Sequence, residues 1–317
     1  MMQNLSVSED AAEMRAINEQ LVISGIREQE YAEKAHQAEQ RAEAALEELQ
    51  VLKEQYEYIA DSLQRSRLFQ PDEDAFSGLM VKTAYIIGGD EDLVGGDFWD
   101  TFAYDHGHVA FVLGDVMGHG LTSAVFTTEL KHTMRAYIRE HEQPGRILYH
   151  MNRFLYQSNR LYREGINTEG DDSPVCIALA VVSRETGEGV LSVAGMEPPI
   201  LVRANSSVDP LEVMGVPLGV LPDAEYLQVN FQLEAGDTLV LSTDGISEAR
   251  RGREFLEMEG LMRLASLGCG GTLKAMTDTI LDGARKFGGG SLRDDASLVL
   301  VRRCATSPSL TKHPDLP

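Results

Sequence analysis

Aspartate residues beside glycine recur at the ends of apolar segments in this chain, and this pattern constrains how the chain can fold. The clearest case is GDVMGHG at residues 114–120, which follows the apolar run 109–113 and precedes a helical pattern over 121–137. Asp115 is therefore predicted to stand where a buried strand gives way to a turn. A carboxylate in that position is poorly solvated and needs a partner.

Three further acidic segments share this setting. Each places an aspartate beside glycine or at the edge of a strand-like run: GGDFWD at 95–100, LSTDGISEA at 241–249 and LRDDASLVLV at 292–301. A lone Asp-Gly is usually a turn and a lone Asp-Asp is usually solvated, so each segment alone is a weak signal. Four together suggest that the aspartates converge. Because converging like charges repel and lose solvation, they imply bound cations.

The candidate metal ligands are all oxygen donors. They are Asp97, Asp115, the carbonyl of Val116, Asp244, and Asp294 or Asp295. No His or Cys stands beside them at a metal-ligand spacing, so the set suits Mg²⁺ or Mn²⁺ rather than Zn²⁺. A carboxylate that bridges two ions about 3.5–4 Å apart lowers the pKa of a bridging water and clamps the oxygens of a displacement at phosphorus. The absence of a convincing Ser/His/Asp or Cys/Arg arrangement agrees with such a two-ion site.

Composition excludes several other classes of protein. The chain has 317 residues, 43% of them hydrophobic, which is enough for one large domain or two small ones. Its formal net charge of -22 argues against nucleic-acid binding and against anionic membranes.

Cysteine usage and hydropathy indicate a cytoplasmic protein. Cys176, Cys269 and Cys304 are far apart, which favours three reduced thiols. The polar and acidic first residues are unlike a signal peptide. No run of about 18 apolar residues occurs, so no membrane span is expected.

Residues 1–70 are predicted to form a helical, dimerising and regulatory segment. They are rich in good helix formers and contain no proline. One seam alternates spacings of four and three: Tyr31, Ala35, Ala38, Ala42, Ala45, Leu49, Leu52, Tyr56, Ile59, Leu63. This repeat is typical of a left-handed coiled coil. A homodimer is therefore expected, with residues 49–63 carrying most of the pairing; the alternative is a helix packed against its own domain.

A change of period marks the main domain, predicted over residues 75–303. Strands are expected at 79–87, 98–104, 109–113, 174–183, 189–193, 199–202, 211–214, 226–233, 237–242 and 296–303. Helices are expected at about 119–141, 144–161, 255–266 and 273–286. Strands and helix pairs in this order predict an α+β fold of antiparallel sheets covered by helix pairs. The Ser/Pro-rich tail, 304–317, is expected to be disordered.

Five segments carry a resemblance to a known family. They are VGGDFWD (94–100), GDVMGHG (114–120), GVPLGV (215–220), STDGISEA (242–249) and RDDASLVLV (293–301). With these segments in family order, the chain resembles the PPM-type (protein phosphatase 2C-like) metal-dependent protein phosphatases, in the bacterial branch similar to SpoIIE and RsbU. The resemblance covers about residues 75–303 and is highly specific.

This resemblance implies an α/β-sandwich and Mg²⁺- or Mn²⁺-dependent hydrolysis of phosphoserine or phosphothreonine on a protein. It implies that Asp115 bridges two ions, that Asp244 and Asp294 serve one ion, and that Asp97 and the Val116 carbonyl serve the other. Asp295 is then a supporting residue. The family's usual partners are small anti-sigma antagonist (STAS) proteins that carry a phosphoserine, and an N-terminal sensor or helical linker often drives its members.

The sequence departs from the family at one position. The family often has AGH before a proline pair, whereas this chain has AGMEPP at 194–199, with Met196 in place of the histidine. This departure and the long N-terminal helix motivate the alternative function, a catalytically weak pseudophosphatase that acts as a binding module. His119 is interpreted as structural, because its offset from Asp115 differs from that of the acid histidine in eukaryotic relatives.

Overall fold

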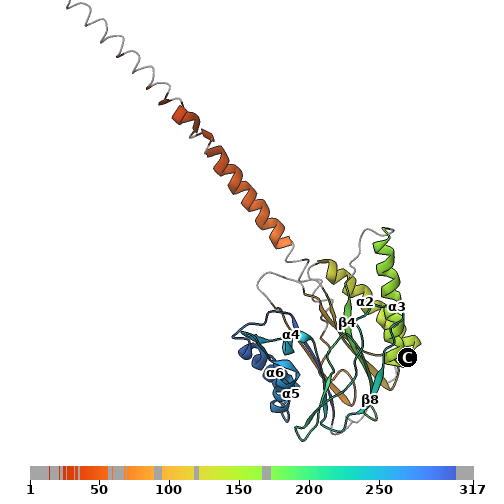
Figure 1. Ribbon diagram of the computed structural model, residues 1–317. Coiled ribbons are helices and arrows are strands. Elements are labelled where there is room, and N and C mark those ends of the chain that lie inside the picture. The colour runs from red at the N-terminus through yellow and green to blue at the C-terminus, as the bar shows by residue number, and fades with distance from the viewer. Residues whose placement is uncertain are drawn as a thin grey trace, which may run out of the picture. The chain divides into compact units, whose positions relative to one another are not determined.

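The computed structural model describes most of the chain (Figure 1). The described residues are 14, 21, 24–25, 27–31, 33–34, 36–55, 59, 68, 70–88, 95–117, 121–165 and 173–304. The chain divides into two compact units, Met1–Ile59 and Ala60–Pro317. The helices and strands that carry labels below all belong to the second unit.

Two five-stranded antiparallel sheets form the centre of the second unit. The first has the order β1-β12-β9-β6-β7, and its strands are β1 (Leu79–Ile86), β12 (Ala296–Arg303), β9 (Thr238–Ser242), β6 (Ile200–Val202) and β7 (Val208–Pro210). The second has the order β2-β3-β4-β5-β8, and its strands are β2 (Asp97–Ala103), β3 (His108–Val116), β4 (Val175–Ser183), β5 (Glu188–Ala194) and β8 (Gln228–Gln232).

A pair of helices covers the outer face of each sheet (Figure 1). Helices α2 (Leu121–Glu140) and α3 (Pro144–Arg163) pack on the second sheet. Helices α5 (Glu257–Leu267) and α6 (Leu273–Phe287) pack on the first sheet. The result is a four-layer α/β-sandwich of the predicted class.

Alternation along the strands explains why both sheets are buried on two faces. On β3, Val109, Phe111 and Leu113 point into the core between the sheets, whereas Ala110 and Val112 point toward α2 and α3. Strand β12 divides its side chains between the two faces in the same way. A strand buried on both faces reads as a continuous apolar run, and this is why these strands could be predicted from sequence.

One predicted strand is wrong. Residues 211–214 form no strand. The strand in this part of the chain is β7, which ends at Pro210, directly before them. Leu211 and Val213 are buried while Glu212 and Met214 are exposed, so this segment has the alternation of a strand. It has no partner strand with which to form a ladder. Alternating burial in an extended chain therefore imitated a strand.

Three short elements of the structure were not predicted from the sequence. The segment after β9 forms the one-turn helix α4 (Asp244–Ser247), and β10 (Arg250–Arg251) and β11 (Glu254–Phe255) form a hairpin. The expected helix over 255–266 consequently begins two residues late, at Glu257. The other predicted elements are confirmed, with ends that differ by one to three residues.

The N-terminal unit contains a helix that is unbroken over residues 36–55. Its seam residues Tyr31, Leu49, Leu52 and Ile59 are exposed by 71%, 64%, 56% and 48%. Seam positions 35, 56 and 63 lie outside the described residues, as does the tail beyond Cys304. No helix in the described part of the chain is both long and apolar enough to cross a bilayer.

Candidate functional site

Two rows of side chains face each other at one end of the core between the sheets. On the second sheet, Asp97 pairs with Asp115 across β2 and β3, and Asp115 pairs with Cys176 across β3 and β4. These three residues form the acidic row. They have the same parity as the inward-facing Trp99, Leu113 and Ala178, so they lie on the inner face.

The hydroxyl row lies on the opposite sheet. Tyr85 of β1 pairs with Ser297 of β12, and the backbone N–H of Thr243 donates to the Ser297 carbonyl at 3.1 Å. A hydrogen bond joins the two rows: the Thr243 hydroxyl donates to Oδ2 of Asp97 at 3.0 Å. Thr243 Oγ1 also accepts the backbone N–H of Ser297 at 2.9 Å. One side chain therefore fixes the spacing of the sheets at the site.

A tight turn sets the register that brings Asp97 and Asp115 together. The carboxylate of Asp105 accepts the backbone N–H groups of Gly107 and His108 at 2.7 and 2.6 Å. This closes the connection between β2 and β3. Because register fixes both the pairing and the face of every residue, the two aspartates become cross-strand neighbours.

The electrostatics of this pair favour a bound cation. Asp97 is 2% exposed, and burial raises its pKa well above the usual value. The charges of Asp115 and Asp295 raise the pKa further, while the hydroxyl groups of Ser297 and Thr243 offset part of the effect. The ionised form of Asp97 is therefore costly in the protein alone. A divalent cation relieves this cost, so the donor set fits Mg²⁺ or Mn²⁺.

The two aspartates of the last motif have different surroundings. The carboxylate of Asp295 accepts the Tyr85 hydroxyl and the backbone N–H of Gly88, both at 2.9 Å. Asp294 is exposed, and its Oδ1 accepts the backbone N–H of Asp295 at 2.8 Å. Asp295 thus ties the segment before β12 to β1 and the chain that follows it, and Asp294 faces outward.

Two glycines are required for the close approach of Asp295. A Cβ on Gly95 would overlap the Asp295 carboxylate and would lie 2.6 Å from the Tyr85 hydroxyl oxygen. A Cβ on Gly245 would overlap the Asp295 backbone carbonyl. Both glycines belong to the motifs that the sequence singled out, and here they allow three distant segments to meet.

Asp244 opens helix α4, close to Asp294. Partial shielding from water raises its pKa, and the charges of Glu248 and Asp294 add to this effect. Cys176 is affected by the charges of both Asp115 and Asp244. Burial, followed by the charges of Asp115 and Asp244, raises the pKa of its thiol to about 12. The thiol therefore stays protonated at neutral pH and is unsuited to nucleophilic chemistry.

The structure also places most of the other residues that the sequence analysis singled out. Val116 is buried at the end of β3, and its N–H donates to the Gly96 carbonyl at 3.3 Å. Met196 is half-buried and packs against the core between the sheets, as its apolar side chain favours. His119 lies outside the described residues. All three cysteines are free thiols, as predicted.

The candidate ligands surround one end of the sandwich without forming a finished coordination shell. The charges of Asp115 and Asp295 act on Asp97, which forms one group of carboxylates. The charge of Asp294 acts on Asp244, which forms a second group. Within residues 70–88, 95–117, 121–165 and 173–304, no three acidic, His or Cys side chains are close enough together to hold one ion.

Sequence reasoning missed Thr243 and Tyr85. Both act through hydroxyl groups on candidate ligands that lie far away in sequence, 146 residues for Thr243 and 210 for Tyr85. Thr243 had one available signal, since it directly precedes the Asp-Gly of a motif. Nothing in the sequence distinguishes Tyr85 from a core tyrosine.

Comparisons with known proteins agree with this architecture. Residues 105–304, more than half of the chain, match the family model of stage II sporulation protein E (SpoIIE). Asp97 precedes the matched range. The chain is 27% identical over 212 residues to phosphoserine phosphatase RsbU of Bacillus subtilis, covering 66% of this chain and 59% of RsbU. It is 22% identical over 154 residues to phosphoserine phosphatase RsbP of the same organism, covering 48% and 36%.

Solved structures share the fold. The SiaA-PP2C domain of Pseudomonas aeruginosa matches with a TM-score of 0.61 and 16% identity, over 80% of this chain and 97% of that domain. The RsbU and RsbW domains of Rv1364c from Mycobacterium tuberculosis match with a TM-score of 0.59 and 22% identity, over 76% and 64%. The sandwich, its motifs and the matched range together establish that this chain belongs to the SpoIIE family and has a PP2C-type fold.

Proposed function

We propose that this protein is a metal-dependent protein serine/threonine phosphatase. The observation that carries the proposal is the acidic row. In it, the buried Asp97 and the half-buried Asp115 are cross-strand neighbours, and the charge of Asp115 raises the pKa of Asp97. Membership of the SpoIIE family and similarity to two phosphoserine phosphatases support it. The chain spans 59% of RsbU and 36% of RsbP, so the activity of either relative is carried over here as part of the proposal.

The proposed roles follow the motif match. By that match, Asp115 would be a ligand of both ions, Asp244 and Asp294 would be ligands of one, and Asp97 and the Val116 carbonyl would be ligands of the other. When bound, Mg²⁺ or Mn²⁺ supplies a Lewis acid that lowers the pKa of water and offsets phosphate charge. Asp295 is a supporting residue, since Tyr85 and Gly88 already occupy its oxygens.

The chain's own groups orient the ligands. Thr243 keeps Asp97 in place through a hydrogen bond to Oδ2 of the carboxylate. Gly95 and Gly245 let the segments that carry Asp97 and Asp244 approach Asp295. Such supporting contacts hold first ligands in place before an ion arrives.

The proposed substrate is a phosphoserine on a small STAS-type anti-sigma antagonist, as in partner-switching pathways. The similarity to RsbU and RsbP, both named phosphoserine phosphatases, supports this class of substrate. We propose that the protein acts as a homodimer through the exposed seam of its N-terminal helix. Three free thiols favour action in the cytoplasm.

The test is hydrolysis of p-nitrophenyl phosphate and of a phosphoserine STAS domain by the full chain with Mn²⁺. Asp115→Asn is expected to reduce the rate by more than about 100-fold. Asp223→Asn, which removes an exposed carboxylate distant in sequence from every motif aspartate, is the matched control and keeps full activity. Equal rates for wild type and Asp115→Asn, after contaminating phosphatases are excluded, contradict the proposal.

A pseudophosphatase that sequesters its partner is the second candidate. The Met196 departure favours it, together with the incomplete grouping of carboxylates among the described residues. Calorimetric titration with Mn²⁺ separates the two candidates. The phosphatase binds two ions per chain, whereas a site that has lost its function does not.

A further inference from the structure

A small cavity opens directly beside the candidate metal ligands. It has a volume of about 210 Å³ and is lined by Gly245, Glu248, Arg250, Phe255, Arg293 and Asp294. Its walls come from the start of α4, the β10–β11 hairpin and the segment before β12. The cavity therefore shares Asp294 with the candidate site.

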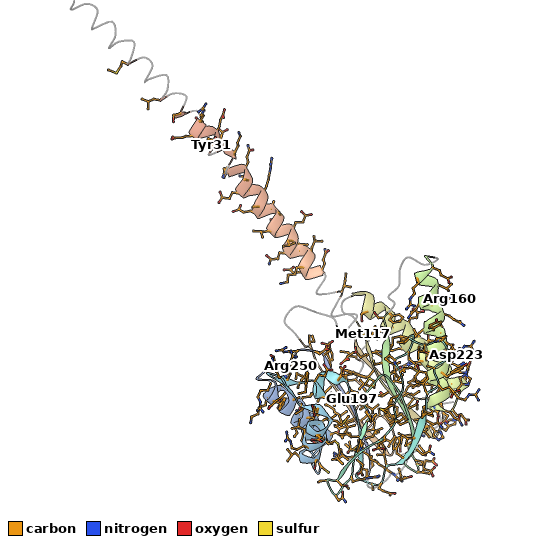
Figure 2. All side chains as sticks on the ribbon, viewed as in Figure 1. Tyr31, Met117, Arg160, Glu197, Asp223 and Arg250 are labelled. Atoms are coloured by element: carbon orange, nitrogen blue, oxygen red, sulfur yellow. The ribbon has the colours of Figure 1, made fainter. Side chains whose placement is uncertain are left out.

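Two arginines that line this cavity are close in sequence to candidate metal ligands. Arg250 begins β10, six residues after Asp244, and Arg293 directly precedes Asp294. Arg250 is labelled in Figure 2. Its guanidinium group lies 5.6 Å from the ring centroid of Phe255, which orients it. Among the described residues, the side chains of Arg250 and Arg293 make no hydrogen bond and no ion pair. In a chain with a net charge of -22, these two guanidinium groups bring positive charge to a cavity beside the candidate metal ligands.

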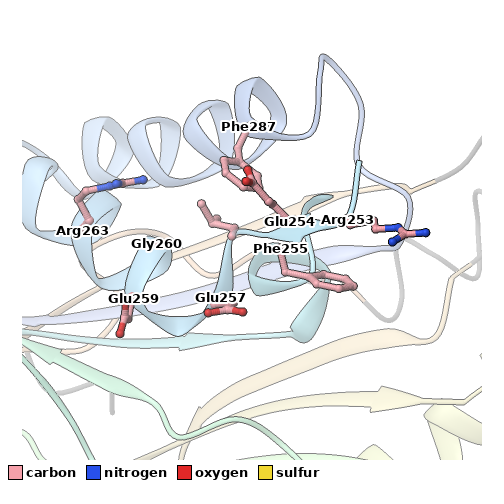
Figure 3. Close-up of a pocket in the computed structure, with 9 residues that line it drawn as sticks. Arg253, Glu254, Phe255, Glu257, Glu259, Gly260, Arg263 and Phe287 are labelled. Carbon is pink, nitrogen blue, oxygen red and sulfur yellow. The ribbon is translucent and has the colours of Figure 1, made fainter. Parts of the chain in front are cut away.

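A neighbouring hollow shows the contrast. It has a volume of about 650 Å³, shares Phe255 with the first cavity and lies between the hairpin and the helices α5 and α6 (Figure 3). Its charged lining residues are Arg253, Arg263, Glu254, Glu257 and Glu259, so acidic groups outnumber basic ones. It contains none of the candidate metal ligands. The smaller cavity has two arginines against two carboxylates, Glu248 and Asp294, and Asp294 is itself a candidate metal ligand. It is therefore the better fit for a phosphate.

We propose that Arg250 and Arg293 bind the phosphoryl group of the substrate and position it against the candidate metal site. This inference rests on the proposed phosphatase function and adds two substrate-binding residues to it. A phosphate monoester carries nearly two negative charges and three acceptor oxygens, and the planar guanidinium group matches these oxygens with paired donors. The ligand class is a phosphate monoester dianion, and the free phosphate product shares its chemistry.

The test compares Arg250→Gln, Arg293→Gln and the double variant with Arg253→Gln. Arg253 lies between β10 and β11 of the same hairpin but lines only the larger hollow, so its variant controls for the loss of one positive charge. Binding of inorganic phosphate to the Mg²⁺-loaded full chain is followed by phosphorus NMR. Each cavity variant is expected to weaken phosphate binding about 10-fold or more.

Steady-state kinetics on a phosphoserine peptide provide the second measurement. The KM of each cavity variant is expected to rise about 10-fold, with a smaller change in kcat. The Mn²⁺ concentration for half-maximal activation is expected to stay the same, because neither arginine is a metal ligand. Arg250→Lys and Arg293→Lys keep the charge without the paired donors and are expected to recover part of the binding.

The outcomes separate this inference from the proposed function. Phosphate affinity and KM equal to those of Arg253→Gln in all three cavity variants overturn the role of the arginines, even if the wild type is an active phosphatase. A wild type that hydrolyses no phosphate ester contradicts the proposed function. In that case the NMR titration still decides whether the two arginines bind phosphate.

Discussion

Thr243 and Asp97 are joined across the two sheets by a hydrogen bond of 3.0 Å from the threonine hydroxyl to Oδ2 of the carboxylate. The same hydroxyl oxygen accepts the backbone N–H of Ser297. This contact links the acidic row to the hydroxyl row, so it fixes the position of the most buried candidate aspartate.

Thr243→Val is therefore expected to destabilise the metal-free protein by about 1–3 kcal/mol, because it leaves the Ser297 N–H and one oxygen of a buried carboxylate without their partner. Urea unfolding in the presence of a chelator measures this change. Thr243→Ser keeps the hydroxyl group and is the control. A valine variant as stable as the serine variant contradicts the assigned role.

Asp97→Asn is expected to stabilise the metal-free protein at neutral pH. Since burial raises the pKa of folded Asp97, the folded state binds a proton more tightly than the unfolded chain, whose Asp pKa is about 3.9. The contribution of Asp97 to stability is thus greatest below that pH and falls as the pH rises through the folded pKa. Asparagine resembles the protonated form, so the advantage of the variant disappears below about pH 4.

Saturating Mn²⁺ is expected to reverse this order of stabilities. An ion that binds only the folded state adds about 2.7 kcal/mol when its concentration is 100 times its Kd. Wild type gains this stabilisation and Asp97→Asn largely loses it. Thermal unfolding with and without Mn²⁺ measures both effects. A variant less stable than wild type in chelator at pH 7 shows that the charge of Asp97 is already compensated within the protein.

A second buried carboxylate anchors β2 to the helix α2. The side chain of Asp100 is 7% exposed and accepts two hydrogen bonds from Arg135, at 2.5 and 2.7 Å. The side chain of Arg135 is 38% exposed, so solvent screening lowers the cost of losing this pair. Arg135→Gln is expected to destabilise the protein by about 2 kcal/mol, measured by urea unfolding.

Arg139→Gln is the matched control for the Arg135 variant. Arg139 also lies over the ring of Phe102, but the only hydrogen bond of its side chain in the described structure goes to the Arg135 carbonyl. The double variant Asp100→Asn/Arg135→Gln is expected to be more stable than the sum of the single changes, because removing both partners leaves no unpaired charge. Strict additivity rules out a coupled pair.

The exposed seam of the N-terminal helix predicts a dimer. Leu49 and Ile59 are exposed by 64% and 48% within one chain, and a second copy of the helix offers a matching surface. Leu49→Asp/Ile59→Asp is expected to sediment as a monomer, while Glu48→Gln on the same helix sediments as a dimer. A double variant that remains dimeric places the contact elsewhere in the protein.

The fold was predictable where burial left a clear pattern. The runs of β3, β4 and β12 could be identified because both faces of each strand are apolar. The pairing of Asp97 with Asp115 follows from the turn at Asp105, which sets the register of the hairpin. Segment 211–214 misled the prediction because its alternating burial comes from an extended chain without a partner strand.

The site was predictable only in its acidic residues. Aspartates beside glycines marked the segments that must approach one another, and Gly95 and Gly245 do contact Asp295. Tyr85 and Arg250 could not be selected, because their roles depend on which segments meet in three dimensions. Thr243 had one signal only, its position directly before the Asp-Gly of a motif. Helix α4 is one turn long, too short to produce a helical period in the sequence.

The central claim is that carboxylates from separate segments hold a pair of divalent ions at the end of the sandwich. Anomalous scattering from a crystal soaked in Mn²⁺ tests it most directly. The account predicts two peaks about 3.5–4 Å apart among Asp97, Asp115, Asp244 and Asp294. A well-ordered crystal with no manganese peak at these four residues contradicts it.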